Sequence, residues 1–252
     1  MKIAVAIRTC GLVYSYWKNS NNRIVDVDKE TIVLTCLNSL LKSIKSSKHE
    51  IVFSIHDDSS SDEILDVMGK LCEKYGIHGE LINLGKLGNF KSQYEWVKKQ
   101  NCDYVYCLED DYLHQESAID DMADMVTALK EFNPGDYAVF PFNCPHRYAS
   151  FTMLYPSYVV KGPNQYWKSS FHSTHTFFIS KQAFAHYDSI MREQAYTWAE
   201  NGAFEDTTIN KIWHEQNVML FTPLQSLAFH IADNTQEDTF FDWKKLWNDN
   251  LI

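Results

Sequence analysis

Three consecutive carboxylates, Glu109, Asp110 and Asp111, directly follow the apolar run Tyr104–Leu108. Adjacent carboxylates repel one another, and a divalent cation is the usual reason to hold them together at the end of a strand. The carboxyl ends of strands in an open α/β sheet are also where ligands bind. The run therefore predicts a metal-assisted site for a phosphorylated ligand. A solvated acidic turn is the alternative that these residues leave open.

Further polar side chains stand where other elements are expected to end or begin. Arg8 and Thr9 close a short apolar run at 3–7, and Asp57 and Asp58 close a second at 51–55. A pair of carboxylates, Glu205-Asp206, opens a late segment with helical spacing. If the strands lie in one parallel sheet, the first four of these residues share an edge with the carboxylate run.

The elements that must position these residues alternate regularly in the first 110 residues. Apolar side chains recur at strand or helix spacing, with a polar or glycine-containing loop between most elements. The predicted order is strand 3–7, helix 28–44, strand 51–55, helix 60–72, strand 80–84, helix 89–99 and strand 104–108. This alternation favours an α/β fold with a mostly parallel central sheet flanked by helices.

The second half of the chain is less regular, yet it shows no clear linker. Helices are expected at 117–132, 181–192 and 205–214, and strands at 137–142, 175–180, 219–221 and 227–229. No internal repeat and no low-complexity segment appear. We therefore expect residues 1–252 to form a single domain.

Composition narrows the classes of partner. The chain has 252 residues and a formal net charge of -10, which argues against a nucleic-acid partner. Six cysteines without a CxxC pair argue against a zinc knuckle and indicate a reducing compartment.

No segment approaches the roughly 18 apolar residues of a membrane span. We expect a soluble cytoplasmic protein. The aromatic segment 240–247 could make a peripheral membrane contact or pack on its own domain.

The first predicted strand is not followed by a glycine-rich phosphate loop. The sequence Arg8-Thr9-Cys10-Gly11 matches neither GxGxxG nor a Walker motif. This argues against a dinucleotide enzyme and against a P-loop NTPase. A bound phosphate must then be neutralised by a metal ion or by side chains.

The order and spacing of these motifs over residues 3–230 resemble the GT-A glycosyltransferases, especially glycosyltransferase family 2. The resemblance implies a Rossmann-like fold. Residues 1–111 would bind a nucleotide sugar, and residues 112–252 would shape the acceptor site. It also implies transfer of one sugar from a nucleotide-diphosphate sugar, with UDP favoured, to a hydroxyl of a glycan, lipid-linked or protein acceptor.

The same resemblance implies roles for the residues of the nucleotide half. Asp57 and Asp58 match the loop that holds base and ribose, with Asp58 accepting from a base N–H; Arg8 and Thr9 would line the same pocket. A second polar loop, with Asn89 and Lys91, would lie near the nucleotide. Purely structural roles are the alternatives to nucleotide binding for several of these residues. They are a capping acidic turn for Asp58, a surface charge for Arg8 and a helix N-cap for Asn89.

Glu109-Asp110-Asp111 resembles the family's DXD motif. This implies that Asp111 coordinates Mn²⁺ or Mg²⁺, and that Glu109 or Asp110 reaches the ribose or a metal-bound water. His230 is compatible with a second protein ligand to Mn²⁺, or with an ordinary core or surface histidine. Which carboxylate binds the metal stays open, because the adjacent acids replace the commoner spaced aspartates.

Glu205-Asp206 resembles the family's Glu-Asp pair on the acceptor side. The resemblance implies that Asp206 is the general base of an inverting transfer, with Glu205 beside it. The alternative is that two carboxylates stand at a helix N-terminus only because the helix dipole favours them there. Other functions also stay open: a sugar-nucleotidyltransferase, a metal-dependent phosphohydrolase, or a non-catalytic protein that binds a carbohydrate or nucleotide sugar.

Overall fold

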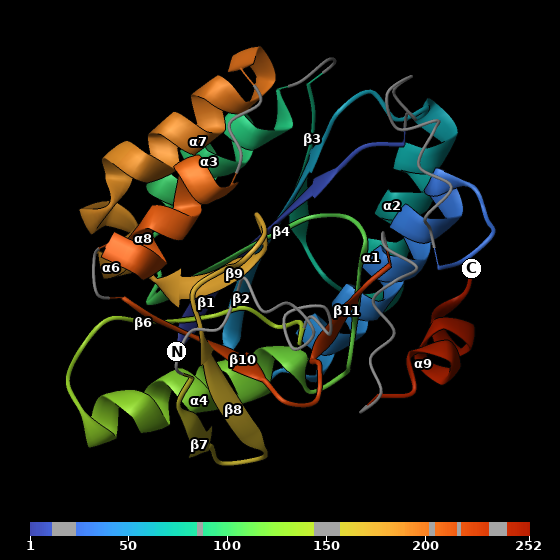
Figure 1. Ribbon diagram of the computed structural model, residues 1–252. Helices are drawn as coiled ribbons and strands as arrows, with labels where there is room; N and C mark the ends of the chain where they lie inside the picture. Colours follow the sequence, from blue (N-terminus) through green and yellow to red (C-terminus); the bar gives the residue numbers. More distant parts are fainter. Residues whose placement is uncertain (12–23, 85–87, 144–156, 202–204, 216–217, 232–240) are drawn as a thin grey trace.

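The computed structural model describes residues 1–11, 24–84, 88–143, 157–201, 205–215, 218–231 and 241–252. In this part of the chain, a nine-stranded sheet forms the centre of the molecule, with the strand order β3-β2-β1-β4-β9-β6-β10-β8-β7 (Figure 1). Its strands are β1 (Lys2–Thr9), β2 (Glu50–Asp57), β3 (Gly79–Asn83), β4 (Tyr104–Leu108), β6 (Tyr137–Val139), β7 (Val159–Lys161), β8 (Tyr166–Ser170), β9 (Phe177–Ser180) and β10 (Met219–Pro223).

Helices lie on both faces of this sheet (Figure 1). They are α1 (Lys29–Ser46), α2 (Asp62–Tyr75), α3 (Asn89–Lys99), α4 (Ala118–Phe132), α6 (Lys181–His186), α7 (Asp188–Asn201), α8 (Ile209–Glu215) and α9 (Trp243–Asn250). The short 3-10 turn η2 (Glu205–Thr207) precedes α8.

The first half of the chain forms the parallel part of the sheet. Strand β1 pairs in parallel with both β2 and β4, and β3 extends the sheet in parallel beside β2. In the second half, β9 and β8 run antiparallel to their neighbours. The predicted fold class, an α/β fold with a mostly parallel central sheet between helices, is confirmed.

Strand β1 shows how the two faces are packed. Ile3, Val5 and Ile7 lie in a core cluster with buried residues of α1, α2 and α4. The alternate residues Ala4 and Ala6 belong to a second cluster with buried residues of α3, α7 and α8. Successive side chains of a strand point to opposite faces, so the buried strand carries apolar residues at every position. The small alanines leave room for the backbone of α3 to approach the sheet.

Two helix starts illustrate how local sequence fixes the elements. Asp28 accepts a hydrogen bond of 2.7 Å from the backbone N–H of Thr31, which confirms it as the N-cap of α1. The helix predicted over 60–72 begins two residues later than expected, at Asp62. Ser61 caps α2 by accepting from Ile64 N, because Ser60 is held in the preceding loop by Asp57.

A second, two-stranded sheet extends from the carboxylate run. Strand β5 (Tyr112–His114) begins immediately after Asp111 and pairs antiparallel with β11 (Ala228–His230). In this register His230 lies opposite Tyr112. Strand β5 was not predicted from the sequence, and its pairing carries a residue near the C-terminus to the end of β4.

The C-terminal helix α9 packs against its own domain. Trp243 and Trp247 are buried, and the Trp243 ring stacks on Phe229 at a centroid distance of 5.2 Å. Asn38 of α1 also donates to the carbonyl of Asn250, at 3.0 Å. The aromatic side chains of α9 therefore face the core, while Phe240 lies outside the described residues.

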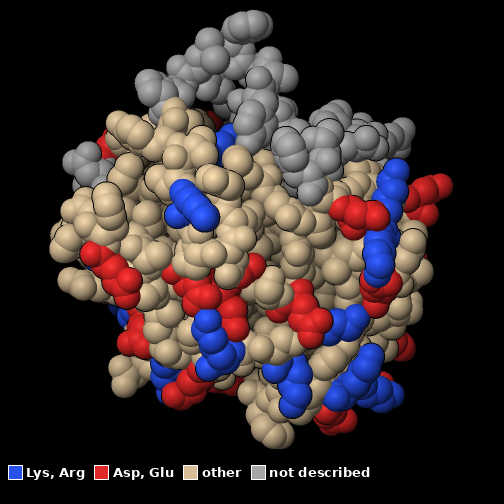
Figure 2. All heavy atoms as spheres, turned by 90° about the horizontal axis from the view of Figure 1, so that it is seen from below, with Lys and Arg blue, Asp and Glu red and all other residues tan. Residues whose placement is uncertain are grey.

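The described surface mixes both signs of charge. On the face seen in Figure 2, acidic and basic side chains lie next to one another. Lys48 at the end of α1, for example, pairs with Asp124 of α4 at 2.8 Å. None of the described helices combines the length and the apolarity that a membrane crossing requires.

Two phenylalanines in opposite environments test the packing around α9. Phe229 is fully buried, whereas Phe132 is 92% exposed. We expect Phe229→Ala to lower the free energy of unfolding by about 3–5 kcal/mol, because it leaves a cavity under Trp243. The matched variant Phe132→Ala should stay within about 0.5 kcal/mol of the unmodified protein. Urea denaturation measures both values, and equal midpoints for the two variants would contradict this packing.

Buried His114 makes stability depend on pH. Its Nε2 is 2.8 Å from Tyr106 Oη, and burial lowers the pKa of His114 from 6.5 to about 3. The unfolded chain therefore binds the proton more tightly, and the stability that neutral His114 gives is lost as pH falls below about 6.5. We expect the advantage of the unmodified protein over His114→Gln to shrink by up to about 1.4 kcal/mol per pH unit between pH 6.5 and 4.5. Urea melts across this range measure it, and a constant difference would refute it.

Candidate functional site

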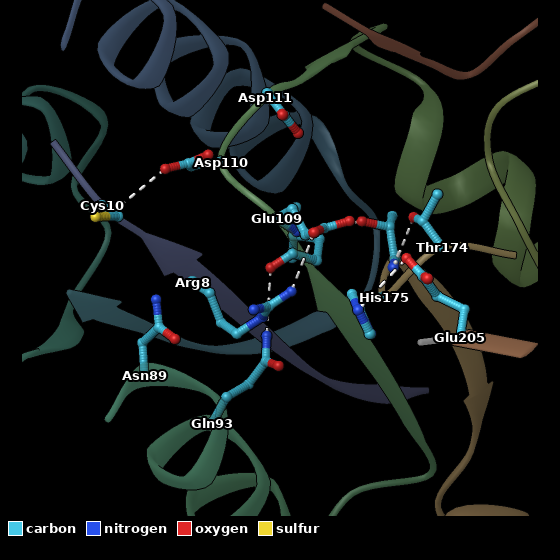
Figure 3. A network of polar contacts seen from close by, with 12 residues as sticks. Arg8, Cys10, Asn89, Gln93, Glu109, Asp110, Asp111, Thr174, His175 and Glu205 are labelled. Atoms are coloured by element: carbon cyan, nitrogen blue, oxygen red, sulfur yellow. Dashed lines mark hydrogen bonds and ion pairs between the residues drawn. The ribbon is translucent and has the colours of Figure 1, made fainter. Parts of the chain in front are cut away.

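The candidate site lies where the parallel strands β1 and β4 end side by side. Ile7 pairs with Leu108, the last residue of β4, so Arg8, still within β1, lies beside Glu109 as the chain leaves β4. Figure 3 shows Arg8 and the carboxylate run, together with residues from α3 and from the segment before β9. The parallel register thus produces the cluster of polar side chains that was expected at this edge.

Each carboxylate of the run has its own basic partner. Arg8 Nη2 lies 3.3 Å from Glu109 Oε1, and His230 Nε2 lies 3.3 Å from Asp111 Oδ1. The ammonium of Lys29 pairs with Asp110, whose other oxygen accepts a 2.8 Å hydrogen bond from Cys10 N. The three basic partners come from β1, β11 and α1, so segments far apart in the sequence meet at one strand end.

Arg8 is largely buried, at 6% exposure, and its guanidinium lies 3.2 Å from the centroid of the Phe90 ring. Among the described residues, its buried Nε and Nη2 atoms have no hydrogen-bond partner, and Nη2 makes the ion pair with Glu109. Burial lowers the pKa of Arg8 against the opposing charges of Glu109 and the two following aspartates. Unpartnered N–H groups in the interior are costly, and a ligand oxygen placed here would relieve that cost.

Burial and pairing set the charges of the run. Burial raises the pKa of Glu109 to about 7, against the influence of Arg8, and also raises the pKa of Asp110, against Lys29. Burial acts to raise the pKa of Asp111 too, but His230 outweighs it and holds that pKa below its usual range. The Asp111 carboxylate in turn raises the pKa of His230 above its ordinary value, although burial opposes this.

Asp111 and His230 also fit a divalent cation. Asp111 Oδ1 is buried and has no hydrogen-bond partner among the residues that the structure describes, and it lies 3.3 Å from His230 Nε2. The Tyr112 ring stacks on that imidazole with a centroid distance of 4.6 Å and fixes its orientation. Among the residues that the structure describes, no cluster of three His, Cys, Asp or Glu side chains could hold a metal on its own. Mg²⁺ is commonly bound through one or two protein ligands, with phosphate and water oxygens as the others.

The loop after β2 is built around Asp57. One carboxylate oxygen accepts from Thr9 Oγ1 at 2.7 Å and Ser60 Oγ at 2.6 Å, and the other accepts from Ser60 N at 2.9 Å. Ser60 Oγ also accepts a hydrogen bond from Gly11 N, at 2.8 Å. A Cβ atom at Gly11 would lie 2.8 Å from this oxygen, so only glycine fits without a shift. The side chains of Asp57 and Thr9 therefore hold the loop together.

Asp58 and Asn89 approach the same end of β1. Asp58 is buried, and its backbone N–H donates to the carbonyl of Thr9 at 2.9 Å. Ser59 then adopts a left-handed conformation, with φ of 64°, which turns the chain sharply. Asn89 is the first residue of α3 and does not act as its N-cap, which is Gly88; its amide donates to the Thr9 carbonyl at 3.4 Å. Lys91, by contrast, lies over the Tyr196 ring of α7.

The Glu-Asp pair lies in η2, before α8, and its two side chains diverge. Glu205 is one-third exposed, and its Oε1 lies 3.4 Å from His175 Nε2. Asp206 is 76% exposed; its Oδ1 accepts from Asn210 at 2.8 Å and lies 3.3 Å from His172 Nδ1. The hydrogen bond from Asn210, followed by the charge of His172, lowers the pKa of Asp206. Asp206 is therefore a carboxylate open to solvent.

Three residues of the site were not predicted from the sequence. Gln93 donates to the carbonyls of Ala6 at 2.6 Å and Leu108 at 3.3 Å, which ties α3 to the ends of both strands. The others are Lys29 and Thr176, whose Oγ1 accepts from Glu109 N. Only Lys29 left a signal: a cation in the first turn of a helix opposes the helix dipole and indicates a nearby anion.

Comparison with known proteins supports the fold. No family model and no curated protein matches the sequence. The structure is similar to that of TarS from S. aureus, with a TM-score of 0.56 and 11% identity over 91% of this chain and 36% of that one. It is similar to TarS 1–349 in complex with UDP, with a TM-score of 0.55 and 13% identity over 91% of this chain and 60% of that one. This chain thus spans about a third of TarS. At such identity the likeness shows a shared fold.

A third solved structure also covers most of the chain. It is a nucleotidyl transferase from Methanothermobacter thermautotroptrophicus, with a TM-score of 0.48 and 9% identity over 98% of this chain and 96% of that one.

The buried pair between Lys29 and Asp110 gives a test of the site's electrostatics. Both side chains are mostly buried, at 14% and 10% exposure. We expect Lys29→Met to lower the free energy of unfolding by about 3 kcal/mol, because it leaves the buried carboxylate of Asp110 without its cation. The double variant Lys29→Met/Asp110→Asn should recover more than half of that loss. Urea denaturation of the three proteins decides, and unchanged stability of Lys29→Met would contradict the pairing.

Proposed function

We propose that this protein is a metal-dependent glycosyltransferase that moves one sugar from a nucleotide-diphosphate sugar to an acceptor hydroxyl. The observation that carries the proposal is that Asp111 Oδ1 and His230 Nε2 lie 3.3 Å apart at the end of β4, close to the buried Arg8. We propose these two side chains as ligands of the metal. A solved protein of the same fold, TarS 1–349, is in complex with UDP, which supports a nucleotide-binding transferase and favours UDP over other bases.

In this proposal, the loops at the ends of β1 and β2 hold the nucleoside. Asp58 accepts from the base N–H, while Thr9 and Asp57 keep its loop in place. Asn89 borders the same pocket through its hydrogen bond to Thr9. Lys91 was also expected near the nucleotide; it lies over Tyr196 of α7, and in this proposal it acts on approaching phosphates through its charge.

The carboxylate run and its partners hold the rest of the donor. Asp111 and His230 would bind Mn²⁺ or Mg²⁺, which supplies a positive charge for the leaving diphosphate. Glu109 accepts from a ribose hydroxyl, and Arg8 donates its unpartnered N–H groups to ligand oxygen. Asp110 stays tied to Lys29 and Cys10 and so shapes the strand end.

Asp206 is the proposed general base. Its carboxylate is ionised and open to an incoming acceptor, and one oxygen is oriented by Asn210 and His172. It takes the proton from the acceptor hydroxyl as that oxygen attacks the anomeric carbon and the bond to the diphosphate breaks. Direct attack from the side opposite the leaving group inverts the configuration. The acceptor is a hydroxyl of a glycan, a lipid-linked glycan or a protein.

Calorimetry with UDP, GDP and dTDP, in Mn²⁺ and then in EDTA, tests the donor site. We expect metal-dependent binding of UDP, weakened at least about tenfold by Asp111→Asn because a charged ligand to the metal is lost. Asp66→Asn is a matched control, since Asp66 is an exposed residue paired with Lys70 on α2. Absence of nucleotide binding to the folded protein would overturn the proposal.

Release of UDP from UDP-sugars, with water as a slow acceptor, separates binding from chemistry. We expect Asp206→Asn to keep UDP affinity within about twofold and to reduce turnover by about 100-fold or more, the usual contribution of a general base. Turnover that is unchanged in Asp206→Asn would contradict the assignment of the base. Hydrolysis to UMP and sugar 1-phosphate, unaffected by added glycan acceptors, would instead favour a phosphohydrolase.

A further inference from the structure

A chain of three polar side chains connects α7 to the candidate site. The amide nitrogen of Gln194 contacts His175 Nδ1, and His175 Nε2 lies 3.4 Å from Glu205 Oε1. Gln194 and His175 are both buried, at 4% and 6% exposure. Figure 3 shows His175 and Glu205 side by side, across from Glu109 and Arg8. Because Gln194 and His175 are buried and Glu205 is partly exposed, these contacts orient the Glu205 carboxylate.

The contacts fix the tautomer of His175. An amide nitrogen can only donate, so Nδ1 accepts and the ring proton resides on Nε2, the atom nearest Glu205. Burial, together with the charge of Arg8, lowers the pKa of His175 well below its ordinary value, and the ring therefore stays neutral. Packing also holds the ring, because Phe90 meets it edge-on at a centroid distance of 4.6 Å.

The packing extends from His175 to the carboxylate run. The face of Phe90 carries the Arg8 guanidinium, and Arg8 pairs with Glu109. Glu205 also contributes to the field that raises the pKa of Glu109, which places its charge near the run. Gln194, His175 and Phe90 thus form a packed group that connects Glu205 to the side of the site where Arg8 and Glu109 lie.

Asp206 has a different environment from its neighbour. It contacts His172 and Asn210 on the exposed side, whereas Glu205 contacts only the buried His175 among these groups. The two histidines come from the single segment between β8 and β9. One segment therefore directs two adjacent carboxylates to two places: Asp206 toward solvent and Glu205 toward the buried end of β4.

The geometry points to His175 as a positioning residue for Glu205, and to Glu205 as the group that binds a hydroxyl of the transferred sugar. This inference rests on the proposed function. The reacting carbon must lie between Asp206 and the diphosphate at Asp111, and Glu205 borders that space. His175 Nε2 lies beside Oε1, and in this inference Oε2 accepts from the sugar hydroxyl; hydrogen bonds to a carboxylate are strong and directional.

The contact itself can be tested without any turnover. Nitrogen-15 NMR of histidine-labelled protein should show His175 as the neutral Nε2–H tautomer between pH 5.5 and 8. Glu205→Gln should shift the Nε2 resonance, whereas Gln194→Leu should allow the Nδ1–H tautomer. A His175 protonated on Nδ1, or insensitive to both substitutions, would overturn the positioning role.

Kinetics test what the contact does. We expect His175→Ala to lower kcat for UDP release by about 10–100-fold, as losses of orienting groups usually do, with UDP affinity unchanged. Added imidazole should restore part of the activity, and circular dichroism checks the fold. His186→Gln, an exposed histidine on α6, is the matched control. The double variant His175→Ala/Glu205→Gln should be no slower than Glu205→Gln, because both changes remove one interaction.

These outcomes separate the two proposals. Fully additive losses, or a kcat of His175→Ala equal to that of the unmodified protein, would overturn the inference while leaving the glycosyltransferase intact. Failure of the unmodified protein to bind any nucleotide would instead overturn the proposed function and the sugar-binding role of Glu205 with it. The NMR result would still decide whether His175 holds Glu205.

Discussion

The structure depends on the neutralisation of three adjacent, mostly buried carboxylates at the end of β4. Glu109, Asp110 and Asp111 would repel one another in the interior, and each has one basic partner, from Arg8, Lys29 or His230. Charges are tolerated in the interior when they are paired and hydrogen-bonded. Because the three partners belong to β1, α1 and β11, the pairing brings segments that are far apart in the sequence to one place.

The same constraint explains elements that have little core of their own. The small β5–β11 sheet carries His230 to Asp111, and α9 covers its outer side through Trp243 on Phe229. On the other face, Gln93 ties α3 to the carbonyls of Ala6 and Leu108. The strand ends and the start of α3 are therefore held by polar contacts at the site, whereas α9 is held by hydrophobic packing.

Much of the fold could be predicted from the sequence, because strand and helix periodicity are strong in the first 110 residues. The contacts within the site were harder to predict, because residues that are distant in sequence leave no local pattern when they meet. No sequence pattern around His175 predicts its contact with Glu205, and β5 is too short to show periodicity. The predicted start of the second helix, at Ser60, was also too early. Ser60 hydrogen-bonds to Asp57, and Ser61 is the N-cap. Motif order placed Asp111 and His230 among the metal ligands, and the structure brings their side chains within 3.3 Å of each other.

The proposed function requires that Asp111 and His230 hold a divalent cation where the diphosphate of the donor would lie. A crystal structure with Mn²⁺ and UDP, with anomalous data collected at the manganese edge, tests it most directly. We expect one manganese peak within about 2.3 Å of Asp111 Oδ1, His230 Nε2 and oxygens of the diphosphate. UDP bound elsewhere, or bound at the end of β4 with no manganese at Asp111, would contradict the account.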